Sequence, residues 1–259
     1  MSCCALEPRD RLLVAVDVSS VDEALVLVEE LHGEVGGFKL GLELFSNTLA
    51  QLGTLPEEEE AIAKLRKWRK LLETGKAAWD NKFDDISNTV GAAAKALKPI
   101  VPLWFNVHAS AGIDAMMAAV ANKGEAMVAA VTVLTSLDAP NAELIFGASV
   151  QAKVLQFARD AKLAAVDAII CSPADLPFLT ARPELKGLEY HTPGVRPAGA
   201  DKGDQARVAT PGGAIKVGAT RIIVGRPVTK PASGTRVEAA RAIVAEIEQA
   251  VTEMAAEKK

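Results

Sequence analysis

Short apolar runs alternate with longer segments of helical periodicity along the chain. This rhythm is typical of βα units, in which each strand of a parallel sheet is followed by a helix. We predict eight strands, at residues 12–17, 37–41, 77–82, 103–108, 126–135, 165–171, 187–192 and 221–225. Eight units without internal repeats favour a (β/α)8 TIM barrel over an open doubly wound sheet, and the glycine-rich motifs of nucleotide-binding sheets are absent from the sequence.

Residue types that cap helices mark the start of two connecting segments. Ser20 precedes the helix predicted at residues 21–31, and its hydroxyl can accept a hydrogen bond from a free backbone N–H group. Ser87 is expected to play the same role for the helix after the third strand. A long helix rich in alanine and glutamate is predicted at residues 237–256.

One segment, residues 55–74, fits neither a strand nor a short loop. It begins acidic and becomes basic, and Ile62, Leu65, Trp68 and Leu72 recur near helical spacing. The acidic start suits the positive end of a helix dipole. We expect an extra helix with a modest apolar face that packs on the barrel, and the alternative is a role in subunit contact.

Length and composition fit one globular domain covering residues 1–259. Apolar residues make up 49% of the chain and charged residues 24%, which provides a sizeable core and disfavours disorder. The net charge of -4 gives no indication of a nucleic-acid or membrane partner. No apolar run approaches the roughly 20 residues of a membrane span, and the first residues lack the pattern of a secretory signal. A cytoplasmic location is therefore expected.

Cysteine and histidine do not show the spacing of a metal site. Two of the three cysteines are adjacent near the start of the chain, and the third, Cys171, ends a predicted strand, so no disulfide framework is indicated. The three histidines, His32, His108 and His191, are far apart in the sequence. We expect neither a metal nor a cofactor.

Four charged residues lie within or at the ends of predicted strands. Asp80 and Lys82 are two residues apart and so share one face of the third strand, while Asp17 ends the first strand and Lys39 interrupts the second. Enzymes with this barrel carry their active residues at the carboxyl ends of the strands. Two acids and two bases are thus expected to meet in one site, where mutual pairing keeps them ionised. The alternative is a structural salt bridge.

Two loops have the composition of a phosphate site. The segment 191–205 is rich in glycine, proline and alanine and is predicted to be a mobile loop after the seventh strand. After the eighth strand, Gly225 permits close backbone approach and Arg226 offers a fork for phosphate oxygens. These two loops bind phosphate in many such barrels. Alternatively, Arg196 and Arg226 form surface ion pairs and Gln205 only starts a helix.

The motifs resemble those of the orotidine 5'-monophosphate decarboxylase family along nearly the whole chain. Asp80, Lys82 and Asp85 form the family's DxKxxD pattern. The likeness continues in the segments ISNT, FNVHAS, VTVLTS, TPGVRPAG with GDQAR, and VGRP. The resemblance implies a cofactor-free enzyme that converts orotidine 5'-monophosphate to uridine 5'-monophosphate and carbon dioxide in de novo pyrimidine biosynthesis.

The resemblance also implies roles for the candidate residues. Lys82 would donate the proton, Asp80 would lie beside the departing carboxylate, and Lys39 and Asp85 would complete the catalytic group. The substrate-binding residues would be Asp17 and Lys39 at the ribose, Thr135 and Ser136 at the pyrimidine, and Arg196, Gln205, Gly225 and Arg226 at the phosphate.

Asp85 lies three residues beyond Lys82, where the chain leaves the barrel. In the family, the equivalent aspartate and the residue at the position of Thr89 reach into the active site of a neighbouring subunit. The resemblance therefore implies a homodimer with active sites shared across the interface.

Two other functions stay open. A related barrel enzyme that shares DxKxxD, a magnesium-dependent sugar-phosphate decarboxylase or aldolase, would need an acidic metal ligand at the end of the second strand, where Lys39 stands. A catalytically silent barrel would bind the nucleotide without turning it over. The chain departs from the family pattern at Ser87, often a proline, and in its long segment 55–74.

Overall fold

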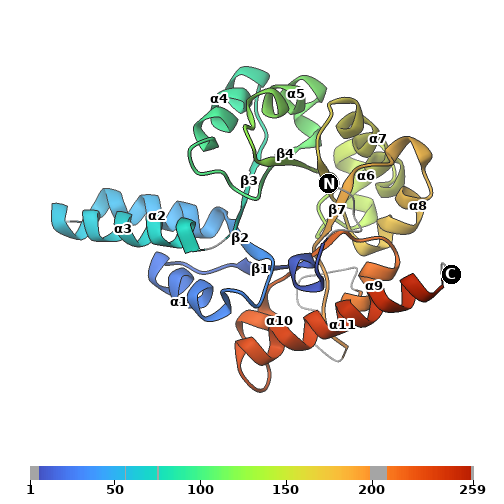
Figure 1. Cartoon of the computed structure of the whole chain (residues 1–259). Coiled ribbons are helices and arrows are strands. Elements are labelled where there is room, and N and C mark those ends of the chain that lie inside the picture. Colours follow the sequence, from blue (N-terminus) through green and yellow to red (C-terminus); the bar gives the residue numbers. More distant parts are fainter. Residues whose placement is uncertain (1–5, 56, 75, 199–208, 258–259) are drawn as a thin grey trace.

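Eight parallel strands close a barrel in sequence order, and β8 pairs with β1 (Figure 1). The computed structural model describes residues 6–55, 57–74, 76–198 and 209–257. The strands are β1 Leu12–Val16, β2 Gly37–Gly41, β3 Ala77–Phe83, β4 Trp104–His108, β5 Met127–Val131, β6 Ala168–Ile170, β7 Glu189–Thr192 and β8 Arg221–Val224. The TIM barrel predicted from the sequence is therefore confirmed.

Helices surround the barrel and cover the outward faces of its strands (Figure 1). They are α1 Val21–Leu31, α2 Leu42–Thr54, α3 Glu58–Thr74, α4 Ser87–Leu97, α5 Ile113–Asn122, α6 Ala139–Phe146, α7 Val150–Leu163, α8 Leu176–Thr180, α9 Pro211–Lys216, α10 Arg226–Thr229 and α11 Arg236–Ala256. Short 3-10 turns are η2 Pro8–Arg11, η3 Ala109–Ala111, η4 Pro173–Asp175 and η5 Pro183–Leu185. Within the described residues, no helix is long and apolar enough to cross a membrane.

The strand predicted at residues 126–135 is too long. β5 leaves the sheet after Val131, and both the backbone N–H and the hydroxyl of Thr132 donate to the carbonyl oxygen of Ile170. The apolar residues that follow, Val133 and Leu134, line a cavity instead of pairing with a strand. An apolar run in the sequence does not distinguish a strand from a loop that forms the wall of a site.

The strands β6 and β7 begin later than predicted because turns occupy the expected first residues. Ala165 has a left-handed backbone with φ of 59°, and the N–H of Val166 bonds back to Ala161 in α7. Gly187 has φ of 95° and turns the chain before β7. The remaining strands lie within one residue of their predicted bounds.

The expected start of α1 is confirmed, and that of α4 is wrong by one residue. The Ser20 hydroxyl accepts the N–H of Glu23 at 3.2 Å, as an N-cap does. Ser87 is the first residue of α4, and the cap position belongs to Ile86, which has no side chain able to accept a hydrogen bond. The carboxylate of Asp85 accepts the N–H of Ile86 at 2.7 Å. α11 begins one residue earlier than predicted.

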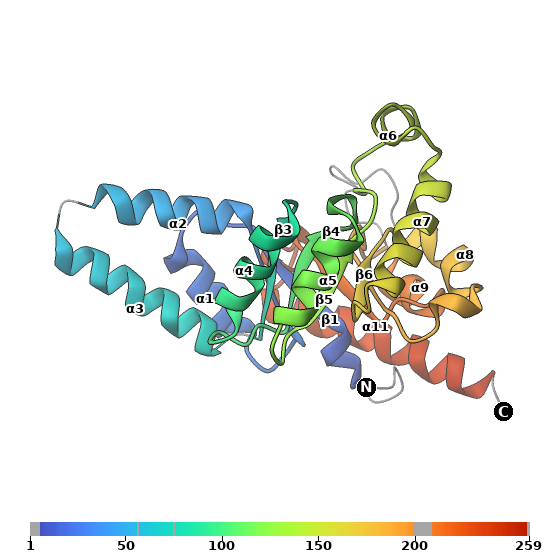
Figure 2. The same cartoon turned by 90° about the horizontal axis from the view of Figure 1, so that it is seen from above.

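The helices α2 and α3 form a hairpin that projects from the side of the barrel (Figures 1 and 2). Its base is held by three aromatic rings. The ring centroid of Trp68 lies 5.5 Å from that of Phe45 in α2 and 6.1 Å from that of Trp79 in β3. The extra helix predicted within residues 55–74 is α3. It starts at Glu58, after α2 has ended at Thr54.

The apolar stripe predicted for α3 is partly wrong. Leu71, which lies outside that stripe, is the buried residue of this helix, while Ile62 and Leu65 are 39% and 50% exposed. The outer half of the hairpin extends past the barrel, and no other described helix or strand covers it (Figure 2). Helical spacing identified the helix but not the length over which it packs.

The barrel interior is filled by one large ring among small side chains. Trp104 of β4 is fully buried and packs in one cluster with Ala78, Ala129 and Ala168 of three other strands and with Leu13 of β1. Close packing of this kind requires large and small residues to alternate around the barrel. The interior is therefore solid, and it separates the two ends of the barrel.

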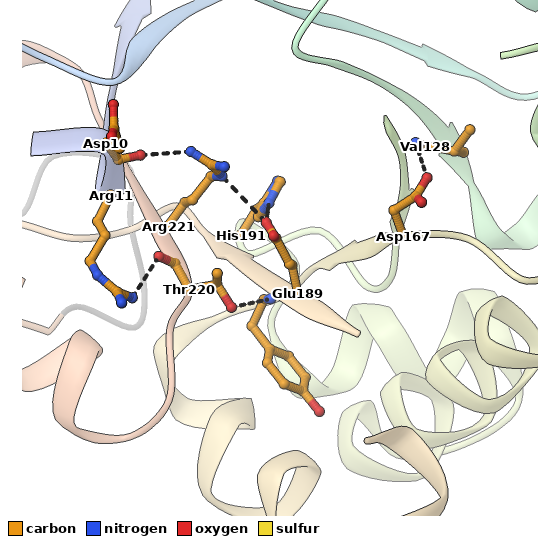
Figure 3. A network of polar contacts seen from close by, with 9 residues as sticks. Asp10, Arg11, Val128, Asp167, Glu189, His191, Thr220 and Arg221 are labelled. Atoms are coloured by element: carbon orange, nitrogen blue, oxygen red, sulfur yellow. Dashed lines mark hydrogen bonds and ion pairs between the residues drawn. The ribbon is translucent and has the colours of Figure 1, made fainter. Parts of the chain in front are cut away.

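A network of charged groups occupies the end of the barrel where the strands begin (Figure 3). The carboxylate of Glu189 lies 3.0 Å from His191 and 3.3 Å from Arg221, and the Arg221 guanidinium donates to the carbonyl oxygen of Asp10 at 2.6 Å. These bonds join β7, β8 and the segment before β1. Polar residues at this end of a TIM barrel contribute to stability, because the active site lies at the opposite end.

The buried imidazole of His191 predicts a loss of stability in acid. Burial lowers its pKa, against the raising effect of Glu189, so below a pH of about 6.5 the unfolded chain binds a proton that the folded chain does not. We therefore expect the free energy of unfolding to fall as the pH is lowered from 7 to 5.5. Urea unfolding at both pH values measures this, and His191→Gln should show a shallower dependence. Equal dependence in the two proteins would refute the assignment.

Candidate active site

Four alternating charges form a row at the carboxyl ends of β1, β2 and β3. The Lys39 ammonium lies 3.1 Å from Asp17 and 2.9 Å from Asp80, and the Lys82 ammonium lies 2.8 Å from Asp80. These strands are neighbours in the sheet, with Lys39 in register with Ala15 of β1. Parallel pairing therefore brings together residues that are far apart in the sequence.

The middle of this row is buried and remains ionised. The side chains of Asp80 and Lys39 are 8% and 14% exposed. Burial favours the neutral form of Asp80, but Lys39 and Lys82 outweigh it and hold the pKa of this carboxyl below its usual value. Burial likewise favours neutral Lys39, but Asp80 and Asp17 raise the pKa of its ammonium above the ordinary value. Mutual pairing thus stabilises the charges that the fold buries.

A bulge in β3 sets the position of Lys82. The pairing of β3 with β4 shifts register between Trp79 and Phe83. Within this interval Lys82 has φ of 49°, a left-handed conformation that non-glycine residues seldom adopt. The Lys82 N–H donates to the side chain of Asn106 in β4 at 2.7 Å.

Two adjoining cavities lie against the charged row. The first has a volume of about 180 Å³ and lies against Asp80 and Lys82, with apolar walls from Val131, Ile170 and Ile223. The second has a volume of about 420 Å³ and is lined by the cationic residues Lys39, Arg196, Arg226 and Lys230 among others. Lys39, Pro193 and Ile223 line both cavities, so the two lie side by side.

The two cavities suit different parts of one ligand. An apolar wall beside an ammonium fits a flat ring that acquires negative charge, and a cationic cavity fits a phosphate. The two cavities therefore offer neighbouring surfaces for an apolar ring and for a phosphate.

Most of the sequence-predicted residues lie at these cavities. Asp17, Lys39, Asp80 and Lys82 form the charged row, Thr135 lines the first cavity, and Arg196, Gly225 and Arg226 line the second. Ser136, beside Thr135, is exposed and lines neither cavity. Gln205 lies outside the described residues, as do residues 199–204 of the predicted loop in which it stands.

Asp85 and Thr89 do not reach the cavities of their own chain. Both are exposed, in the loop after β3 and in the first turn of α4, and neither lines the first or second cavity. Ile86 between them has a side chain that is 70% exposed. These residues form a surface segment beside the mouth of the site.

Sequence reasoning missed three residues at the site. Asn106 bonds to both Asp80 and Lys82, and its signal was a polar residue inside the apolar fourth strand. Lys230 lines the cationic cavity but follows a short helix that no pattern identified. A Cβ at Gly41 would lie 3.2 Å from the Lys39 ammonium, so this glycine leaves room for the ion pair with Asp17.

Comparisons with known proteins agree with this geometry. The sequence model of the orotidine 5'-phosphate decarboxylase / HUMPS family matches residues 10–243. The orotidine 5'-phosphate decarboxylase of Rhodopseudomonas palustris (strain BisB5) is 40% identical over 248 residues, covering 93% of this chain and 96% of that protein. The Moorella thermoacetica protein of the same name is 38% identical over 256 residues, covering 94% of each. The crystal structure of orotidine 5'-phosphate decarboxylase from Lactobacillus acidophilus superposes with a TM-score of 0.71 at 28% identity, covering 91% of this chain and 98% of that one.

The charged row predicts a large effect of neutralising its central carboxylate. Asp80→Asn leaves two ammonium groups without the anion they share, and breaking a buried pair by removing one partner costs about 3 kcal/mol of unfolding free energy. Asp160→Asn, on the outer helix α7, is the control and should change stability by about 0.5 kcal/mol or less. Urea unfolding of both variants compares them. Equal stability of the two would show that Asp80 does not hold the row together.

Proposed function

Because the chain belongs to the orotidine 5'-phosphate decarboxylase / HUMPS family, we infer that it converts orotidine 5'-monophosphate to uridine 5'-monophosphate and carbon dioxide. This reaction is a step of pyrimidine biosynthesis and makes the chain a carboxy-lyase. The observation that carries the inference is the Lys82 ammonium, held 2.8 Å from Asp80 at the wall of an apolar cavity.

The proposed chemistry rests on Lys82. The bond between the pyrimidine ring and its carboxylate breaks, carbon dioxide leaves, and the electron pair stays on the ring carbon. The Lys82 ammonium stabilises this carbanion as it forms and then transfers a proton to it, so that the product carries hydrogen where the substrate carried carboxylate. An ammonium already fixed in place need not reorganise during the reaction, and a cavity with apolar walls strengthens its effect.

Asp80 and Lys39 support that ammonium in the proposed mechanism. Asp80 holds the Lys82 ammonium in position at 2.8 Å, and it would lie beside the departing carboxylate. Lys39 neutralises the far oxygen of Asp80 at 2.9 Å and, with Asp17, faces the second cavity, where the ribose would bind. The row therefore has no net charge before the substrate enters.

The second cavity would supply binding energy far from the reacting carbon. Arg196, Gly225, Arg226 and Lys230 line it, and a phosphate there would be held by their charges and backbone. Gln205 would add a contact from the loop after β7, and Thr135 and Ser136 would face the pyrimidine. Binding energy from a remote group can be used to position the reacting group against Lys82.

The position of Lys39 speaks against the magnesium-dependent alternative. Lys39 stands in the second strand, where that enzyme would need an acidic metal ligand, and its ammonium lies between the carboxylates of Asp17 and Asp80. A cation placed there would meet a like charge at close range. A silent barrel would bind the nucleotide without converting it, so an assay of turnover distinguishes it from the enzyme.

We further propose a homodimer in which Asp85 and Thr89 complete the site of the partner subunit. Three observations support this: both residues are exposed, neither lines a cavity of its own chain, and the neighbouring Ile86 presents a 70% exposed apolar side chain. The single-domain organisation and the cytoplasmic location expected from the sequence stay predictions.

Lys82→Ala should abolish decarboxylation while leaving the fold intact. The substitution removes the proposed proton donor, and a loss of at least about a thousandfold in kcat is expected. The fall in ultraviolet absorbance on mixing with orotidine 5'-monophosphate measures turnover, and Lys216→Ala, an exposed residue at the end of α9, is the control. A variant that keeps a few per cent of wild-type activity would remove Lys82 from this role, and an inactive wild type would leave the binding-only barrel.

Mixing inactive subunits should restore activity if sites are shared. Lys82→Ala and Asp85→Asn subunits are unfolded together and refolded, so that random pairing makes half of the dimers mixed. Each mixed dimer would hold one site with both lesions and one with neither, so about a quarter of wild-type activity is expected. If both residues acted within one chain, mixing would restore nothing and the shared site would be disproved.

A further inference from the structure

We propose that Asn106 is a positioning residue that holds Asp80 and Lys82 in their reactive arrangement. The expected effect on catalysis rests on the proposed decarboxylation. The hydrogen bonds of Asn106 do not depend on that function. Asn106 lies in the middle of β4, is fully buried, and lines neither cavity. It would therefore act on the substrate only through the two residues that it touches.

The two ends of the Asn106 amide make different bonds. Its oxygen accepts the backbone N–H of Lys82 at 2.7 Å, and its nitrogen donates to Oδ1 of Asp80 at 2.6 Å. An N–H group requires an acceptor and a carboxylate requires a donor, so these partners fix which end of the amide faces which residue. A carboxylic acid at this position would have no permanent donor for Asp80, and an alkyl side chain would have neither group.

The bond to Lys82 replaces one that the sheet cannot make. Three residues of β3 lie between Trp79 and Phe83, against one residue of β4 between Phe105 and Val107, so the bulge takes the intervening N–H groups out of regular pairing. Lys82, with φ of 49°, sits in this bulge, and the side chain of Asn106 serves as its acceptor. A strained backbone persists only where its surroundings hold it.

The bond to Asp80 fixes the plane of the carboxylate. Oδ1 receives both the Lys82 ammonium and the Asn106 amide, and Oδ2 receives the Lys39 ammonium. Without the amide donor, the carboxylate can turn about its last bond, and the Lys82 ammonium would turn with it. One side chain of β4 thus controls both the backbone of Lys82 and the partner of its ammonium.

The decisive comparison uses Asn106→Leu, which keeps the approximate size of the side chain but removes both bonds. The expected result is a fall of about a hundredfold in kcat with orotidine 5'-monophosphate, as a displacement of about 1 Å at a reacting group produces. KM should change by less than about threefold, because the residues at the second cavity are untouched. Thr220→Val is the matched control: its hydroxyl also accepts a backbone N–H, from Tyr190 at 3.0 Å, but at the opposite end of the barrel.

Asn106→Asp separates the two bonds and preserves polarity if the leucine variant does not fold. The aspartate can still accept the Lys82 N–H but places an acceptor against Asp80, so kcat should fall while the Lys82 amide stays protected. Hydrogen exchange of that amide, followed by nuclear magnetic resonance, should be slow in the wild type and in Asn106→Asp. In Asn106→Leu it should be at least about tenfold faster.

The outcomes distinguish this inference from the proposed function. An inactive wild type with the expected exchange pattern would overturn the decarboxylase and keep the geometry. If the wild type is active and the kcat of Asn106→Leu lies within threefold of the wild-type kcat, the positioning role is overturned. An equal loss of kcat in Thr220→Val would also overturn it, because it would show a general effect of lost buried hydrogen bonds.

Discussion

The carboxylate of Asp80 is the group on which the rest of the site depends. It is 8% exposed and receives three donors, from Lys39 in β2, Lys82 in β3 and Asn106 in β4. A carboxylate at this depth is stable only when its charge is compensated and its lone pairs are bonded. Because the donors come from three neighbouring strands, the parallel pairing of β2, β3 and β4 is what brings them to the carboxylate. A charged ammonium at the edge of an apolar cavity is the product of this arrangement.

The two ends of the barrel use buried charge for different purposes. At the ends of the strands, the row from Asp17 to Lys82 opens into two cavities. At their beginnings, Glu189 is enclosed by His191 and Arg221 and ties the last two strands to the segment before the first (Figure 3). The packed layer around Trp104 lies between them.

The segment that carries Asp85 and Thr89 lies at the surface of the chain and lines neither cavity. That segment follows the strained bulge of β3 directly, so the geometry that places Lys82 inward also sends the next residues out to the surface. In the proposed dimer, the same short piece of sequence would serve two sites at once. Assembly and activity would then be linked through one loop.

The sequence by itself determined the barrel and most of the site, because alternating apolar and helical runs specify βα units and because charges inside apolar strands require partners. Asp17, Lys39, Asp80 and Lys82 were identified in this way before any contact was known. The tertiary structure alone decided where β5 ends and where β6 and β7 begin, the exposure of the outer half of α3, and the contacts of Asn106. Local sequence does not encode these features. A loop wall and a strand are equally apolar, the packed length of a helix depends on what lies beside it, and the partner of Asn106 is 26 residues away across a bulge.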